Sequence, residues 1–139
     1  MDSHNILSLL GLALRGGNLA VGEEPVEAVA RARDARVLLL AEDAADNTLR
    51  RVRHFAEAGD CLWLRIPYTK EELGQAVGRT SLAIAAVTDA SMALAMLRSL
   101  PEPGKYQASI DALEEKSRKL QKRRQEAKAH QRNVRKGKK

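Results

Sequence analysis

The sequence predicts a three-layer α/β/α sandwich followed by a basic C-terminal extension. Three observations predict it: helical and strand patterns alternate along the chain, the central strand candidates are apolar throughout, and cationic residues gather in the last quarter. Strands that are apolar on both faces are typical of a sheet covered by helices on each side. A chain of 139 residues has room for one core with an appendage. We expect residues 1–100 to form the folded domain and residues 101–139 a basic tail, partly helical or disordered.

The first half of the chain contains two predicted helices and two predicted strands. The first helix has an apolar stripe, is capped by Asp2 or Ser3, and ends at the glycine pair after Arg15. A short extended segment, NLAVG, follows it. The second helix begins at the acids of GEEPVEAVARARD, with Pro25 in the first turn, where proline is tolerated. The apolar run in RVLLLAED predicts a strand buried on both faces.

The alternation continues in the second half. A helix is expected from about Asp46 to Gly59, and CLWLRI is the third strand candidate. Thr69 and Glu72 form a capping-box pattern at the start of a short helix. SLAIAAV predicts the fourth strand, and Thr88 or Asp89 caps the helix of ASMALAMLRSL. The inner face of this last helix is expected to carry Met92, Ala95, Met96 and Ser99.

The charge of the chain is unevenly distributed. Residues 105–139 hold 13 Lys and Arg against 4 Asp and Glu, whereas residues 1–104 hold 11 against 14. Such a basic block attracts polyanions. Nucleic acid is favoured over a membrane, because the tail after Leu120 lacks the Trp, Phe or Leu face that a membrane-binding helix needs. Lys122, Arg123 and Arg124 are the expected tail contacts.

The sequence offers few residues for catalysis. The three histidines are isolated, no His/Cys group has metal-ligand spacing, and no nucleotide-binding glycine motif is present. We therefore expect no cofactor and no metal. The best catalytic candidate is the pair Glu42 and Asp43, which could hold Mg²⁺ at the end of an apolar strand. The alternative is that these acids are solvated or cap the following loop.

The expected location is the cytoplasm. Cys61 is the only cysteine and cannot form an intramolecular disulfide, which fits a reducing compartment. The N-terminus has no export pattern, and the longest apolar runs are too short to span a bilayer.

Two stretches, LALRGGNLAVGEEPVEAVARARDARVLLLAEDAADNT and IPYTKEELGQAVGRTSLAIAAVTD, resemble a known family. They look like the kink-turn-binding ribosomal protein superfamily (L-seven-Ae, L-thirty-e, S-twelve-e and Gadd), and more narrowly its short bacterial YlxQ-type members. The resemblance covers roughly residues 5–98. It implies a mixed four-stranded sheet and a non-enzymatic protein that grips sharply bent RNA at tandem sheared G·A pairs.

The resemblance also implies a set of RNA-binding residues. Gly22 opens the binding turn, Glu24 accepts hydrogen bonds from guanine edges, and Leu49 makes an apolar contact. Arg15, Arg31 and Arg79 are expected to contact the RNA backbone. Arg79, Thr80 and Ser81 lie in the loop that closes over an unstacked base.

Two positions differ from the pattern of the family that the chain resembles. Glu23 and Glu27 also belong to the expected RNA-binding residues, but they stand where well-studied RNA binders carry Asn and Lys. Acids here suit the start of a helix, because the helix dipole favours negative charge there. They also repel phosphates, so the resemblance does not by itself imply strict kink-turn specificity.

These observations together predict a non-catalytic RNA-binding protein, associated with ribosomes or structured RNA and monomeric when free. The tail would supply sequence-independent affinity, while the domain selects RNA shape. A protein-interaction module using the acidic edge, as in the Gadd branch, is the first alternative. A metal-dependent enzyme using Glu42 and Asp43 is the second.

Overall fold

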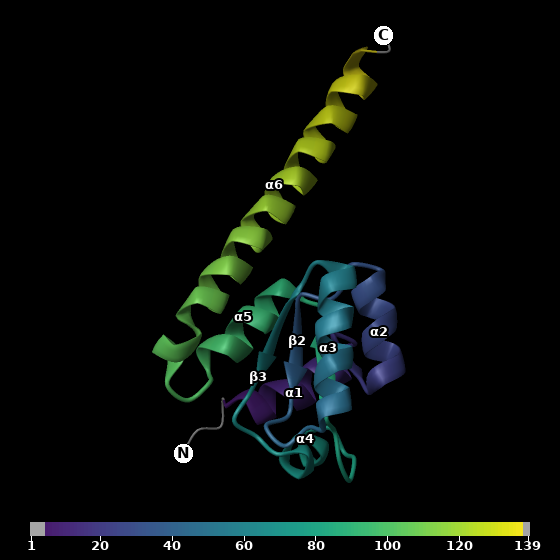
Figure 1. Cartoon of the computed structure of the whole chain (residues 1–139). Helices are drawn as coiled ribbons and strands as arrows, with labels where there is room; N and C mark the ends of the chain where they lie inside the picture. Colours follow the sequence, from purple (N-terminus) through teal and green to yellow (C-terminus); the bar gives the residue numbers. More distant parts are fainter. Residues whose placement is uncertain (1–4, 138–139) are drawn as a thin grey trace.

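A mixed four-stranded sheet is enclosed by helices on both faces (Figure 1), which confirms the predicted α/β/α sandwich. The computed structural model describes residues 5–137, except the side chains at 103, 120, 121, 124 and 128–137. In chain order the elements are α1 (Ile6–Arg15), β1 (Leu19–Val21), α2 (Glu23–Arg31), β2 (Val37–Leu40), α3 (Asp46–Gly59), β3 (Leu62–Arg65), α4 (Lys70–Ala76), β4 (Ile84–Val87), α5 (Ala90–Arg98), the 3-10 turn η1 (Pro103–Tyr106) and α6 (Gln107–Gly137).

The strand order is β1-β4-β2-β3, with β4 antiparallel to both neighbours and β3 parallel to β2. Leu40 at the end of β2 pairs with Ile84 at the start of β4. Val21 at the end of β1 pairs with Ala85. This side of the sheet is called the Gly22 end below. The opposite side, where β2 and β3 begin, is called the Arg33 end.

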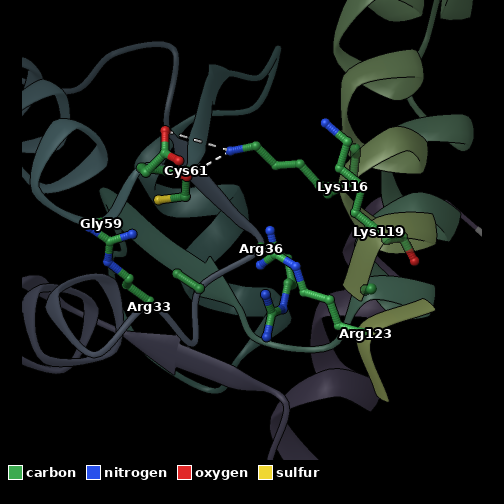
Figure 2. Close-up of a pocket in the computed structure, with 12 residues that line it drawn as sticks. Arg33, Arg36, Gly59, Cys61, Lys116, Lys119 and Arg123 are labelled. Atoms are coloured by element: carbon green, nitrogen blue, oxygen red, sulfur yellow. Dashed lines mark hydrogen bonds and ion pairs between the residues drawn. The ribbon is translucent and has the colours of Figure 1, made fainter. Parts of the chain in front are cut away.

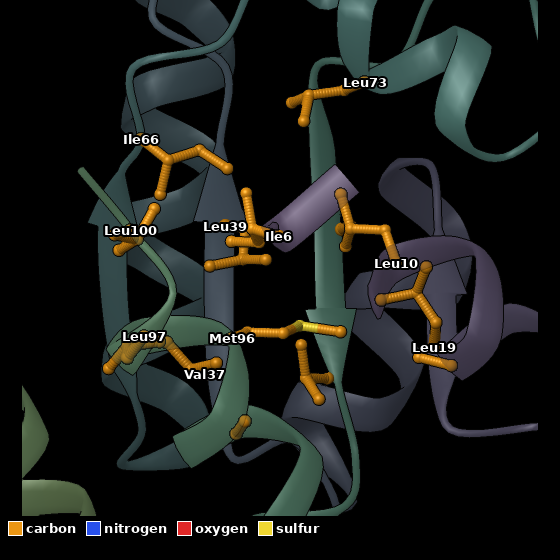
Figure 3. Packing of buried hydrophobic residues seen from close by; sticks show 14 of the residues in the cluster. Ile6, Leu10, Leu19, Val37, Leu39, Ile66, Leu73, Met96, Leu97 and Leu100 are labelled. Carbon is orange, nitrogen blue, oxygen red and sulfur yellow. The ribbon is translucent and has the colours of Figure 1, made fainter. Parts of the chain in front are cut away.

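Each face of the sheet has its own apolar core. On one face, Val26 of α2 and Phe55 of α3 pack with Leu38 of β2. On the other, side chains of α1 and α5 pack against the sheet; Figure 3 shows Ile6 and Met96 among them. The edge strand β3 is only half-buried. Burying a Leu or Phe side chain in either core stabilises the folded state by about 1.5–3 kcal/mol.

Helix caps follow the sequence predictions in two of three cases. Thr69 and Glu72 form the expected capping box, and the Asp89 side chain accepts a hydrogen bond from the Met92 amide. Asp2 and Ser3 lie outside the described residues, and the prediction that one of them caps α1 is wrong. Asn5 does so, because its Oδ1 accepts from the Ser8 amide at 3.1 Å.

The predicted inner face of α5 is partly wrong. Met96 is buried, but Ala93 and Leu97 are its buried companions and Ala95 is exposed. The helix is apolar on several sides, so the periodicity of its sequence does not single out one face.

The apolar core continues beyond residue 100, where the sequence pattern placed the end of the domain. Tyr106, Ile110 and Leu113 are buried in the same core as α1 and α5. Arg98 of α5 pairs with Glu114 of α6 at 2.9 Å. From this anchor α6 runs as a single long helix past the body of the protein (Figure 1). Within residues 5–137, none of the helices has the length and apolar character needed to cross a bilayer.

Candidate functional site

Two segments that are far apart in sequence meet at the Gly22 end. The first is the turn of residues 22–24, called the Gly22 turn, and the second is the loop of residues 78–82 between α4 and β4. The Gly22 amide donates to the Ile84 carbonyl at 3.1 Å, which fixes the turn beside β4. The Arg79 Nη1 lies 3.7 Å from the place where a Cβ on Gly22 would stand. The structure therefore brings Gly22 and Arg79 together.

The backbone of the Gly22 turn requires glycine. Gly22 is the only residue between β1 and α2 and has a φ of 93°, a conformation that residues with a Cβ rarely adopt. Without a side chain, Gly22 cannot cap the first amides of α2. Within residues 5–137, the amides of Glu23 and Glu24 find no acceptor. The turn thus presents backbone donors at the positive end of the α2 dipole.

The loop of residues 78–82 is held tightly against α4. The Arg79 amide donates to the Gly74 carbonyl at 2.7 Å, and the Leu82 amide donates to the Lys70 carbonyl at 2.9 Å. A Cβ on Gly74 would lie only 2.6 Å from the Ser81 nitrogen, so only glycine permits this approach. Beside the loop lies an open hollow of about 380 Å³, lined by Asp43, Lys70, Glu71, Gln75, Arg79, Thr80 and Ser81.

Two of the three acids near the Gly22 turn are paired with arginine. Glu23 forms an ion pair with Arg51 of α3. Glu27 pairs with Arg31, four residues along α2, at 2.8 Å. Glu24 is exposed and forms no ion pair within the described part of the chain. The local negative charge is therefore smaller than the sequence suggests.

Arg51 was not among the residues predicted from the sequence. It lies 28 residues from Glu23, and the neighbouring positions on α3 also carry exposed arginines. Nothing in the local sequence distinguishes it, because the pairing exists only once α2 and α3 pack together.

The remaining predicted residues lie further from the turn. Leu49 of α3 is half-buried and packs on the α2–α3 core. Arg15 ends α1, and its Nη1 lies 3.7 Å from the Cβ position of Gly11, which packs on Ala76 of α4.

The tail residues lie on α6, apart from the Gly22 turn. Lys122 and Arg123 are exposed there. The side chain of Arg124 lies outside the described residues.

The strand-end acids serve the local structure. The Asp43 Oδ1 accepts a hydrogen bond from the Lys70 amide at 2.8 Å, so Asp43 satisfies the first amide of α4. Glu42 is exposed, and its backbone amide donates to the Tyr68 carbonyl. Among residues 5–137, no group of three or more His, Cys, Asp or Glu side chains could hold a metal ion.

Comparison with known proteins identifies similar chains. A Bacillus subtilis (strain 168) protein named RNA-binding protein YlxQ is 36% identical over 89 residues, which are 61% of this chain and 84% of the relative. A protein of the same name from Enterococcus faecium is 30% identical over 73 residues, 52% of this chain and 70% of the relative. No family model matches the chain.

Two solved structures have a similar fold. A protein of unknown function from Bacillus halodurans C superimposes with a TM-score of 0.59 at 26% identity, covering 78% of this chain and 98% of the other. The Giardia lamblia 15.5kD RNA binding protein superimposes with a TM-score of 0.55 at 18% identity, covering 77% and 85%. The second likeness shows a shared fold.

Proposed function

Since the chain belongs to the family of RNA-binding proteins called YlxQ, we propose that it binds structured RNA of the kink-turn type through the Gly22 turn. Ribosomal RNA is the expected class of target, and binding takes place in the cytoplasm by a monomer without catalytic activity. The basic part of α6 from Lys122 onward adds sequence-independent affinity.

The observation that carries this proposal is the contact between the Gly22 turn and the loop of residues 78–82. A protein that recognises RNA shape must fit the backbone and unstacked bases of a bent duplex at the same time. The turn offers the backbone donors at the start of α2, and Arg79 adds a guanidinium beside it. The adjoining hollow, with Thr80 and Ser81 at its rim, suits the edge of an extruded base.

The pairing of acids fits the same role. With Glu23 held by Arg51 and Glu27 by Arg31, the turn repels phosphates less than three free carboxylates would. Glu24 remains exposed, and a free carboxylate accepts hydrogen bonds from the amino group that guanine presents.

Glu24→Ala tests the proposal. We expect it to weaken binding to a kink-turn RNA by about 1–3 kcal/mol, the loss of one base contact, and to leave binding to a straight duplex unchanged. Fluorescence anisotropy at a fixed salt concentration measures both dissociation constants. Glu57→Ala, on an exposed site of α3, is the matched control.

An unchanged dissociation constant for Glu24→Ala would remove Glu24 from the site. If the full chain shifts no structured RNA even at low salt, the proposal is wrong. A protein-interaction module of the same fold would then be favoured.

A further inference from the structure

A cationic cleft lies at the Arg33 end of the domain, between α6 and the loops that follow α2 and α3 (Figure 2). Its volume is about 320 Å³. Among the described residues that line it, five are cationic and one, Asp60, is acidic. The cations come from both walls: Arg33, Arg36, Lys116, Lys119 and Arg123.

A direct contact between α6 and the loop after α3 fixes the two walls of the cleft relative to each other. The Lys116 Nζ donates to the Asp60 carbonyl at 2.6 Å and lies 3.9 Å from the Asp60 Oδ1. The burial of Ile110 and Leu113 fixes the same stretch of α6 against the body. Figure 2 shows Arg36 and Arg123 reaching into the space between these walls. The cleft is therefore a built surface and not a chance approach of two flexible segments.

The positive charge of the arginines in the cleft is not neutralised by the described residues, whereas Lys119 pairs with Glu115 at 3.9 Å. Within the described residues, Arg33, Arg36 and Arg123 form no ion pair. Asp60, which carries the only carboxylate among the described lining residues, already faces Lys116. Burial raises the pKa of the Cys61 thiol above its ordinary value, so the thiol supplies no negative charge at neutral pH. An anion in this cleft would relieve repulsion among the cations.

The backbone of the cleft is unusual at Arg33. Arg33 has a φ of 62°, the left-handed conformation in which helices commonly end with glycine. An arginine there is strained relative to glycine. Asp60 also has a positive φ, so two of the three such non-glycine residues among residues 5–137 line this cleft. Both residues lie just past the end of a helix, where this conformation is common, and they turn the chain into the two loops that line the cleft.

We propose that this cleft binds the phosphate backbone of RNA, as a second contact at the opposite end of the domain from the Gly22 turn. The proposal rests on the RNA-binding function proposed above. Planar guanidinium groups match phosphate oxygens in bidentate geometry. The described part of the lining contains no aromatic side chain on which a base could stack, so the contact is with phosphates and independent of sequence.

The two contacts require an extended RNA. The nine residues of α2 separate the Gly22 turn from the Arg33 loop, a distance of about 13 Å along the helix axis. An RNA that reaches both sites must continue as a stem for several base pairs beyond its bend.

Arg123→Gln tests the cleft, with Arg118→Gln as the matched control. Both positions are exposed arginines of α6, but Arg118 does not line the cleft. We expect Arg123→Gln to weaken binding to bent RNA and to a straight duplex alike, by about 3- to 10-fold, and to reduce the slope of log K against log salt by about 1. Arg118→Gln should stay within about twofold of the unmodified chain.

Arg33→Gly separates binding from folding. Because glycine prefers the left-handed conformation, this variant should melt at the same temperature as the unmodified chain or higher, while binding both RNAs more weakly. Differential scanning fluorimetry and anisotropy give the two readouts.

The outcomes distinguish the two proposals. If Arg123→Gln and Arg33→Gly bind RNA as the control does, the cleft is not an RNA site. The role of the Gly22 turn is judged separately, by whether Glu24→Ala loses the preference for bent RNA. If the unmodified chain binds neither RNA, both proposals are wrong.

Discussion

The ion pairs around the Gly22 turn mainly reduce the negative electrostatic potential at the turn and add little to stability. The pairs Glu23–Arg51 and Glu27–Arg31 are both largely exposed, and exposed pairs contribute only about 0–1 kcal/mol to stability. Their effect on an approaching phosphate is larger, because each pair replaces a net negative charge by a neutral group. Pairing therefore decides which carboxylates can act on RNA.

Glu23→Ala and Glu24→Ala should consequently have opposite effects on RNA binding. Removing Glu23 frees Arg51 to meet a phosphate, so we expect binding to tighten about two- to fivefold, since one exposed ionic contact contributes up to about 1 kcal/mol. Titration of both variants with the same kink-turn RNA measures the difference. Weaker binding by Glu23→Ala would mean that Glu23 itself contacts RNA.

Single-residue roles were predictable from sequence where the interaction is local. Thr69, Glu72 and Asp89 cap their helices as their spacing predicts, because the partners lie three residues apart. The Glu23–Arg51 pair was not predictable, because it depends on how α2 packs against α3.

At the level of elements, α4 and its loop depend on one close approach. Gly74 lets the Ser81 backbone lie directly on the helix, and the same loop carries Arg79 to the Gly22 turn. The loop geometry and the proposed site therefore share a single steric requirement.

Gly74→Ala should lower stability and RNA affinity together. The added Cβ would collide with the Ser81 backbone, and overpacking of this kind costs about 1–3 kcal/mol. Urea denaturation measures the change in the free energy of unfolding. Gly104→Ala is the control, since no atom lies within 4 Å of its Cβ position. Equal stability of the two variants would contradict the steric argument.

The order of the elements was predictable because apolar stretches, turn glycines and capping residues alternate clearly along the chain. The strands VLLL and IAAV are buried along their whole length, as their sequences indicate. The edge position of β3 was not predictable, because strand order depends on contacts between segments distant in sequence.

At the level of the whole molecule, α6 belongs to the core at one end and is a charged arm at the other. Tyr106, Ile110 and Leu113 are buried, so deleting residues 105–139 would damage the fold. A deletion of residues 122–139 removes nine Lys and Arg and one Glu without touching these three.

We expect this shorter deletion to flatten the salt dependence of RNA binding. If the full chain contacts about six phosphates, log K falls against log salt with a slope of about −5, and the shortened chain should approach about −2. The preference for bent over straight RNA should remain. An unchanged slope would show that the arm does not contact RNA.

The cleft and the extent of the core were beyond sequence analysis for one reason. Both depend on α6 packing against the body, and its anchoring side chains form only a short apolar stripe ahead of a long polar segment. The resemblance to YlxQ-type proteins ended near residue 98 and gave no guide to this segment.

The uneven charge makes the molecule a strong electric dipole. Residues 1–104 are net acidic, and residues 105–139, most of them in the protruding helix, are net basic. In the field of a polyanion such a particle rotates before it collides. We therefore expect α6 to contact the polyanion before the rest of the domain does, so that each encounter begins in nearly the same orientation.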